Sequence, residues 1–215
     1  MSGIIINSYA YAATGLADVD NLYSMDFDGV DEYLSIGNPT ELQITGALTL
    51  SAWVKGSGGS GNHEAILYKD DQVNRCYKMQ IEGAVPNGYL TFSIFNSNVV
   101  FHTYGTSDLF DGNWHHIVGV YTPSTSVVLY VDGVLETNNT SSVPASIDND
   151  PADFEIGRKG NNTLHFDGKI DEAAVWNSAL SASDVLDIYN KTSAGKTADL
   201  SSMTTPPVGW WRMGD

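Results

Sequence analysis

The stretch DGNWHHIVGVYTPSTSVVLYVDGVLE, residues 111–136, decides the fold class. Asp132-Gly133 stands between two runs rich in Val, Leu and Tyr, and an Asp-Gly pair in that position is a strong signal for a tight β-hairpin. In WHHIVGVY, residues 114–121, alternate side chains belong to opposite faces, as expected for a strand covered on at least one side. The stretch therefore predicts antiparallel β-structure.

The same kind of pattern continues through most of the chain. From residue 22 to 176, short runs rich in Val, Ile, Tyr, Phe, Trp and Thr are separated about every 8–12 residues by Gly, Asn, Asp or Pro, which predicts a sandwich or a barrel. The exception is LSASDVLDIYNK, residues 180–191, where apolar residues approach a 3.6-residue period behind Ser181 and Asp184. We expect one short capped helix there.

The tripeptide Phe-Asp-Gly occurs three times, at residues 27–29, 110–112 and 166–168. The copies are 83 and then 56 residues apart, and their flanking residues differ, whereas true repeats recur at a fixed period. We interpret them as turn residues, since Asp and Gly favour tight turns. Their carboxylates remain available for a second role.

Composition excludes several classes of partner. The chain has 26 acidic and 10 basic residues and a formal net charge of −16, which repels nucleic acid and anionic membrane surfaces and attracts divalent cations. No apolar run approaches the roughly 20 residues of a membrane span. The first residues lack the basic start of a signal peptide, so none is recognised. Cys76 is the single cysteine and has no partner for an internal disulfide.

Six segments occur in the order typical of one family: residues 25–36, 48–55, 111–121, 129–136, 154–160 and 166–185. In this order the chain resembles LamG-like, concanavalin A-like jelly-roll domains over roughly residues 22–191. The resemblance implies an all-β fold of two stacked antiparallel sheets with one short helix near the C-terminus. Residues 1–21 are then expected to form an N-terminal arm, and residues 192–215 an extended C-terminal tail or linker.

The resemblance also implies a structural calcium ion. Relatives of this fold often hold a cation where the first and last strands meet, which by position points to Asp171, with Asp26 and Asp28 as partners. A second place is the acidic turn with Asp70 and Asp71. Calcium needs six to eight oxygen ligands, but such acids also occur simply as turn residues or solvated charges, and both interpretations stay open.

The motifs of common catalytic sites are missing from the sequence. Glycoside hydrolysis on this fold needs paired carboxylates, and the laminarinase-type pattern Glu-x-Asp-x-x-Glu does not occur. GSGGSG, residues 56–61, precedes a strand-like run rather than a helix, which argues against a nucleotide site. His115 and His116 point to opposite faces of a strand and cannot bind one zinc ion together. Trp53, Trp114 and Trp176 lie in strand-like runs and are expected to be buried.

The expected function is therefore ligand binding by a non-catalytic module. Loops rich in Gly, Asn and Ser supply amides and aromatic rings around one rim, and the concave sheet is an alternative location. The expected ligand-binding residues are His63, Asp70, Asp71, Asn74, Arg75, Asn96, Tyr104 and Asn161.

The leading hypothesis is a module that binds a glycan or a surface protein, in adhesion or in recognition of a host or substrate. The alternative is a structural component of a virion or surface layer, located on the cell surface or in the particle, whose terminal arms contact neighbouring subunits. A glycoside hydrolase is the least favoured hypothesis, because the paired carboxylates are absent.

Overall fold

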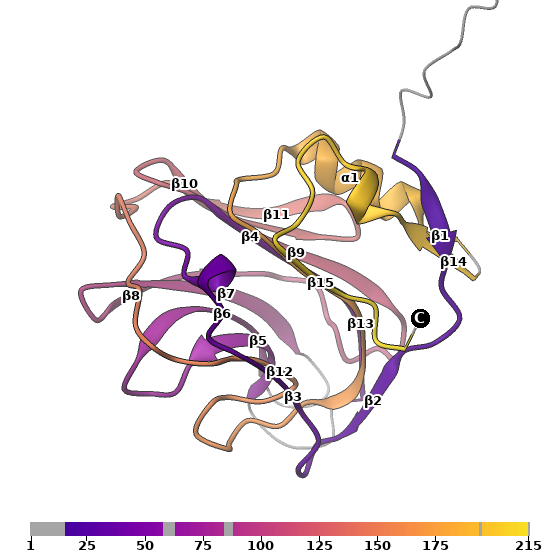
Figure 1. Ribbon diagram of the computed structural model, residues 1–215, viewed down its shortest axis with the longest axis horizontal. Helices are drawn as coiled ribbons and strands as arrows, with labels where there is room; N and C mark the ends of the chain where they lie inside the picture. Colours follow the sequence, from indigo (N-terminus) through magenta and orange to yellow (C-terminus); the bar gives the residue numbers. More distant parts are fainter. Residues whose placement is uncertain (1–15, 58–62, 84–87, 194, 215) are drawn as a thin grey trace, which may run out of the picture.

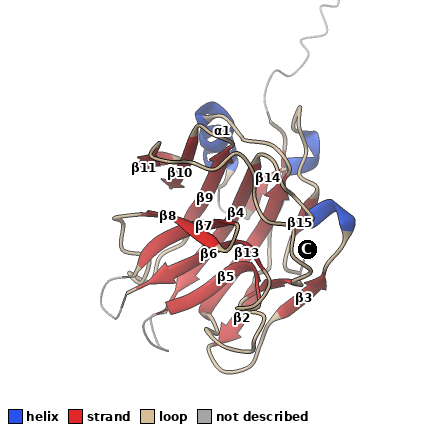
Figure 2. Cartoon of the chain, turned by 90° about the vertical axis from the view of Figure 1, so that its left-hand side faces the viewer, coloured by secondary structure: helices blue, strands red, loops and turns tan. Residues whose placement is uncertain are grey.

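Two antiparallel sheets stack on one another in the computed structural model, which describes residues 16–57, 63–83, 88–193 and 195–214 (Figures 1 and 2). The seven-stranded sheet has the order β11 (Val134–Asn139), β10 (Ser126–Val131), β9 (His115–Thr122), β4 (Leu48–Gly56), β13 (Asp167–Trp176) and β15 (Gly209–Trp211), and β2 (Met25–Asp28) also pairs with β13. The six-stranded sheet has the order β3 (Leu34–Gly37), β12 (Phe154–Ile156), β5 (His63–Asp70), β6 (Arg75–Glu82), β7 (Tyr89–Asn96) and β8 (Val99–Tyr104). The expected all-β sandwich is confirmed.

The shared core comes from the inward-facing residues of both sheets. Along β7, Leu90, Phe92 and Ile94 belong to the main core cluster, and the residues between them face away from it. The sheets approach closely at Gly119 of β9, where an added Cβ would lie 2.5 Å from the ring of Phe92. Each sheet also has an outer face, the one turned away from this core.

The hairpin predicted at Asp132-Gly133 joins β10 to β11 through these two residues. Their φ angles are 51° and 74°, the left-handed values that a two-residue hairpin turn of this kind requires. The sequence signal therefore predicted both the position and the geometry of the turn.

Helix α1 (Ala182–Lys191) covers the outer face of the seven-stranded sheet. Ser181 and Asp184 form the capping box, in which the Ser181 side chain accepts from the Asp184 backbone and Asp184 accepts from the Ser181 backbone. Val185 and Ile188 pack in a second cluster with outward-facing residues of β9, β10 and β13. The helix is thus fixed by burial of one apolar face.

The first and last predicted strands lie side by side, because β2 pairs with the start of β13. The third Phe-Asp-Gly copy was expected to form a turn but lies at this pairing: Phe166 is buried and Asp167-Gly168 begins β13. The prediction was wrong there because an added Cβ at Gly168 would collide with the Lys55 carbonyl of neighbouring β4. Glycine serves close strand packing at this site rather than a turn.

The expected extended tail, residues 192–215, is instead built into the fold. β14 (Lys196–Ala198) pairs with β1 (Asp18–Asp20), and β15 adds to β13. The Trp211 ring stacks on Phe154 with ring centroids 5.4 Å apart, and Trp210 packs against the second cluster. Burial of the two indoles holds this segment to the sheet, which Pro206-Pro207 and the short apolar run did not indicate. Of the expected N-terminal arm, residues 1–15 lie outside the described residues.

The three tryptophans that were expected to be buried differ in their exposure to solvent. Trp176 is fully buried, Trp53 is half-buried, and Trp114 is 37% exposed because β9 begins one residue after it, at His115. The prediction for Trp114 was therefore wrong: it belongs to a loop end, not to a strand.

Two 3-10 turns, Thr40–Leu42 and Leu200–Ser202, complete the described elements. None of the described helices is long and apolar enough to cross a membrane.

Candidate functional site

A row of polar side chains crosses the outer face of the six-stranded sheet. Strand register places side by side one residue from each of five neighbouring strands, which we call the polar row: Glu155 of β12, Tyr68 of β5, Lys78 of β6, Ser93 of β7 and His102 of β8. Their neighbours along each strand point into the core, so the row is a direct consequence of strand alternation. Of its five residues, Lys78 and His102 are partly exposed, and Tyr68, Ser93 and Glu155 are buried.

Contacts within the row hold its side chains in place. The Lys78 ammonium lies 5.3 Å from the centroid of the Tyr68 ring and 5.9 Å from that of Phe95. Burial lowers the pKa of Lys78 from its ordinary value and raises that of Tyr68. The Tyr68 hydroxyl donates to Gln80 Oε1, and Gln80 Nε2 donates to Glu82 Oε1 over 2.6 Å. The network is preorganised before any ligand arrives.

The β8 end of the row is open to solvent. His102 Nδ1 lies 2.8 Å from Ser93 Oγ, and the His102 ring is 5.6 Å from that of Tyr104, which is 51% exposed. Burial lowers the pKa of His102, and the nearby Lys78 cation lowers it further. His102 is therefore neutral at pH 7 and offers both a donor and an acceptor nitrogen.

The β12 end carries a fixed ion pair. The Arg158 guanidinium donates to both carboxylate oxygens of Glu155, over 2.9 and 2.8 Å, and lies over the Tyr33 ring. This bidentate geometry fixes the Glu155 carboxylate in position. Tyr33 is 41% exposed, so the row ends in a partly exposed ring on this side as well.

The structure divides the expected ligand-binding residues between two ends of this sheet. The first end carries Asp70, Asp71, Asn74, Arg75, Asn96 and Asn161. Asn161 belongs to the loop after β12, and its Nδ2 donates to Gln72 Oε1 over 2.8 Å. His63 and Tyr104 lie at the opposite end, because β5 begins and β8 finishes there. The eight residues therefore do not form one site.

Most polar groups of the first end are engaged inside its own turn. Asp71 accepts from the backbone of Val73 and Asn74 and from Asn74 Nδ2, over 2.6–2.9 Å. Burial alone would raise the pKa of Asp71, but these hydrogen bonds lower it. Asp70 is buried, accepts from the Gln72 backbone and faces Arg75 at 3.8 Å. These acids stabilise a turn, and calcium binding there stays a prediction.

The acids expected to bind calcium at the β2–β13 pairing are also dispersed. Asp26 contacts Lys169 over 2.8 Å, while Asp171 accepts from Asn21 Nδ2 over 3.0 Å. Among the described residues, three acids on and just after β2 form one group whose possible ligand atoms lie within 4.8 Å of one another: Asp28, Asp31 and Glu32. Of the predicted ligands only Asp28 belongs to it.

The group formed by Asp28, Asp31 and Glu32 has internal hydrogen bonds. A hydrogen bond between the side chains raises the pKa of Glu32 and lowers that of Asp28. The two carboxyl groups therefore hold a proton between them more tightly than an isolated glutamate would. Calcium binding at this group remains a prediction.

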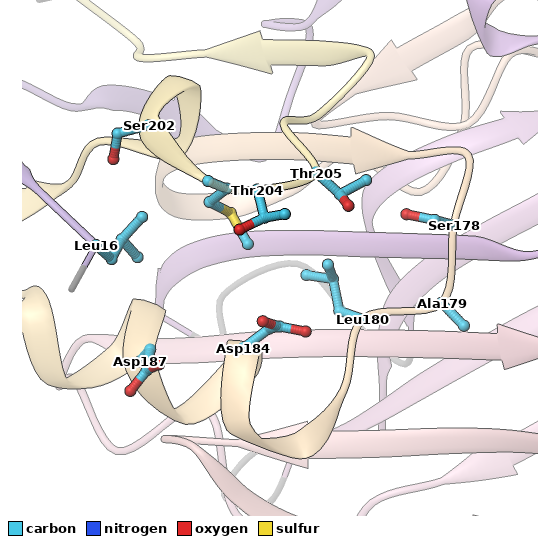
Figure 3. Close-up of a pocket in the computed structure, with 10 residues that line it drawn as sticks. Leu16, Ser178, Ala179, Leu180, Asp184, Asp187, Ser202, Thr204 and Thr205 are labelled. Atoms are coloured by element: carbon cyan, nitrogen blue, oxygen red, sulfur yellow. The ribbon is translucent and has the colours of Figure 1, made fainter. Parts of the chain in front are cut away.

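One hollow lies on the opposite side of the molecule, beside helix α1 (Figure 3). Asp184 and Asp187 of the helix line one side, and Ser202, Thr204 and Thr205 line the other. Asp184 is already engaged by Ser181 in the capping box. The residues that line the hollow are mostly small or acidic, and none of them is aromatic. The hollow is therefore a weaker candidate for a binding site than the polar row.

None of the five residues of the polar row was among the expected ligand-binding residues. Its signal was present as polar residues at alternate positions, in KMQIE (78–82) and in TFSIF (91–95), which are otherwise apolar strands. Which strands lie next to one another, and in what register, decides that these residues meet. The sequence pattern does not contain that information.

The chain belongs to the concanavalin A-like lectin/glucanases superfamily, whose laminin G-like family 3 pattern matches residues 28–186. The resemblance noted in the sequence is confirmed. A search of curated proteins found no match.

Several solved structures share the fold. Domain 4 of AbnA, an extracellular arabinanase of Geobacillus stearothermophilus, solved in complex with arabinotriose, is 21% identical with a TM-score of 0.57, covering 80% of each chain. A Ruminococcus gnavus CBM40 bound to α2,3-sialyllactose is 10% identical with a TM-score of 0.59, covering 78% of this chain and 98% of its own. The binding domain of botulinum neurotoxin serotype G is 11% identical with a TM-score of 0.61, covering 83% of this chain and 47% of its own.

Proposed function

We propose that this protein is a non-catalytic module that binds glycans across the outer face of the six-stranded sheet. The observation that carries the proposal is the open part of the polar row, where Lys78 and His102 are partly exposed and the His102 ring lies next to the exposed Tyr104 ring. The buried Tyr68 and Ser93 contact Lys78 and His102 from below and hold their side chains in place. Sugar rings present hydroxyl groups at their edges and C–H groups on their faces. A surface with fixed polar groups and partly exposed rings is suited to both.

Rigidity of the site supports recognition. The side chains of the row belong to strands in the middle of a sheet, and Tyr68 and Ser93 are fully buried by their neighbours. A preorganised surface loses little conformational entropy on binding, so weak individual contacts add to a useful affinity. Tyr104, at the open end, is the exposed ring against which a sugar would pack.

The comparisons support the same class of ligand. Two of the similar structures were solved with an oligosaccharide, arabinotriose in one and sialyllactose in the other. At identities of 21% and 10% they share a fold with this chain, and the choice of sugar has to come from this chain's own side chains. An extracellular location follows from the proposal, since the glycans of other cells and of polysaccharide matrices lie outside the cell.

Hydrolysis is disfavoured by the state of the acids on this face. A general acid for glycoside cleavage needs a carboxyl group kept protonated near neutral pH. Among the described acids, burial raises the pKa of Glu172 to about 7, but this residue lies on the other sheet. On the outer face, both carboxylate oxygens of Glu155 are engaged by the Arg158 guanidinium.

The alternative of a structural virion or surface-layer subunit rested on free terminal arms. In the described part of both segments, residues 18–20 pair with residues 196–198 and residues 209–211 pair with β13. These contacts are within one chain. The glycan-binding proposal therefore has the stronger physical support.

A glycan array followed by calorimetry tests the proposal. We expect saturable binding of at least one neutral or acidic oligosaccharide, with a dissociation constant of about 10–1,000 µM. Tyr104→Ala should weaken binding by about five- to tenfold, because packing of a sugar ring on one aromatic side chain contributes on the order of 1–1.5 kcal/mol.

The matched control is Leu186→Ala, since Leu186 is also a large exposed side chain, at 44%, but belongs to helix α1 on the other sheet. It should leave the affinity of the outer face unchanged. Absence of binding across the array, or equal losses in the two variants, would contradict the proposal.

A further inference from the structure

A second pocket, of about 330 Å³, opens on the opposite sheet. Its floor is the outer face of the seven-stranded sheet, where strand register sets Trp53 of β4 directly beside Asp171 of β13. One wall is the segment from Asn21 to Ser24, and the other is formed by Thr192, Ser193, Gly195 and Lys196. The volume is at the lower end of the range for small-molecule sites, which suits a single ring.

Buried polar atoms without partners gather at this floor. Trp53 Nε1 and Asn21 Oδ1 are buried and have no hydrogen-bond partner in the part of the chain that the structure describes. Buried polar groups in proteins are nearly always hydrogen-bonded, and a buried donor or acceptor without a hydrogen bond costs about 1–3 kcal/mol. One donor and one acceptor at the base of an open pocket therefore indicate a position for hydroxyl groups.

Asp171 adds a fixed carboxylate. It is 5% exposed, accepts from Asn21 Nδ2 over 3.0 Å and accepts from the Glu172 backbone N–H over 2.8 Å. These two donors fix the carboxylate in a single orientation.

Aromatic rings complete the pocket. The Trp53 ring stacks on His116 with centroids 5.2 Å apart and on Tyr189 of α1 at 5.9 Å, which locks the indole in place. Trp114 and Tyr23 stand at the rim and are 37% and 63% exposed. A rigid ring at the floor and exposed rings at the mouth offer packing surfaces for the C–H face of a sugar.

The charge of the pocket excludes anionic ligands. Its lining contains the Asp171 carboxylate and one cation, Lys196, whose Nζ lies 3.4 Å from Asp18 and 3.2 Å from Asp20. The cation is thus neutralised by two carboxylates, while the whole chain carries a formal charge of −16. A carboxylate or phosphate on the ligand would be repelled.

We propose that the pocket formed by Asn21, Tyr23, Trp53, Trp114 and Asp171 binds one neutral pyranose ring. Asp171 and Asn21 accept hydrogen bonds from ring hydroxyls, Trp53 Nε1 donates to a third oxygen, and Trp114 packs on the C–H face. The site lies on the other sheet from the polar row, so the module would hold two sugar positions on opposite faces. The proposal for this pocket is independent of the proposed site on the outer face of the six-stranded sheet.

Indole N–H signals in a proton–nitrogen NMR spectrum test the proposal on the whole chain. The protein has five tryptophans and so gives five such signals. The probes are the methyl glycosides of glucose, galactose, mannose and N-acetylglucosamine, each titrated to about 50 mM because a single ring is expected to bind with a millimolar dissociation constant. At least one glycoside should shift the Trp53 and Trp114 signals saturably. Trp176 is the internal control, since it is buried and its Nε1 donates to Thr205 O.

Two variants decide whether the shifts come from this pocket. Asp171→Asn keeps the shape but removes the charge and should weaken the interaction about tenfold, because hydrogen bonds to charged groups are the stronger ones. Asp187→Asn, at the hollow beside α1, is the matched control and should change nothing. Trp114→Ala, at an exposed rim position, covers the case in which Asp171→Asn fails to fold, and it should also weaken binding.

The same spectrum distinguishes the two proposed sugar sites. A shift of the His102 backbone amide signal without a shift at Trp53 or Trp114 would contradict the pocket proposal but not the proposal for the outer face of the six-stranded sheet. Shifts at the two tryptophans alone would support the pocket and not the outer face. The proposal would be overturned if no glycoside shifted the Trp53 and Trp114 signals, or if Asp171→Asn and Trp114→Ala bound the glycoside as tightly as the wild type. It would also be overturned if these signals shifted with the cation choline and not with the glycosides.

Discussion

Replacing His115 with glutamine should make the protein less stable at acidic and neutral pH but not at alkaline pH. His115 Nδ1 lies 2.8 Å from Asp132, and its Nε2 lies 3.1 Å from Asp111. The contact with Asp132 and then that with Asp111 raise the pKa of His115 from 6.5 to about 9, against the effect of burial. The cluster fixes the loop end that carries Trp114, so its stability bears on the pocket as well.

The magnitude follows from the pKa. At about 1.4 kcal/mol per pH unit, a rise from 6.5 to about 9 gives an upper limit of about 3.5 kcal/mol. Asp111 and Asp132 are 38% and 31% exposed, and pairs of that kind typically contribute 0–1 kcal/mol each. We therefore expect about 1–2 kcal/mol. Because the folded pKa is the higher one, this stabilisation is complete below about pH 6.5 and is lost as the pH rises through about 9.

Urea unfolding followed by tryptophan fluorescence measures the effect in both proteins at about pH 6, 8 and 10 and constant salt. The difference in unfolding free energy between wild type and His115→Gln should be largest at pH 6 and shrink by about 1–2 kcal/mol by pH 10. Comparing the two proteins at each pH cancels the titration of other groups. A difference that does not change with pH, or that grows toward pH 10, would refute the reasoning.

Three further predictions concern packing and metal. Trp211→Ala should lower the unfolding free energy by about 2–3 kcal/mol, since its half-buried ring stacks on Phe154, and a loss under about 0.5 kcal/mol in the same urea assay would mean that the segment is a free tail. Gly119→Ala should cost about 1–3 kcal/mol, because its Cβ would meet the Phe92 ring of the facing sheet, and a neutral result in thermal unfolding would contradict that close approach. Calcium at about 5 mM should raise the melting temperature by about 2–5 °C through the acids near β2, and Asp31→Asn should abolish the rise; equal curves with and without calcium would exclude this site.

The fold was largely predictable because its signals are local. Alternation of apolar residues, the Asp132-Gly133 turn and the Ser181–Asp184 capping box each act within a few residues, and each was found as predicted. Strand β15 was missed, because its three residues have no periodicity to detect. The segment is a strand because it pairs with β13, and Trp211 packs on Phe154, 57 positions earlier in the chain.

The site was less predictable because it depends on register. Asp70, Asp71 and Asn74 were recognised as loop residues of the right chemistry, but the structure uses them to bond their own turn. Lys78 and His102 are single polar residues within largely apolar strands of the sequence, and the pairing of β6, β7 and β8 brings them into one row. Chemistry of this kind is visible only after strand neighbours are known.

The most direct test of glycan binding on the six-stranded sheet is a crystal structure of the protein with the oligosaccharide that binds most tightly on the array. We expect a sugar ring against Tyr104, with hydroxyl groups within hydrogen-bond distance of His102 or Lys78. A saturating oligosaccharide bound elsewhere, with the polar row left open, would contradict it.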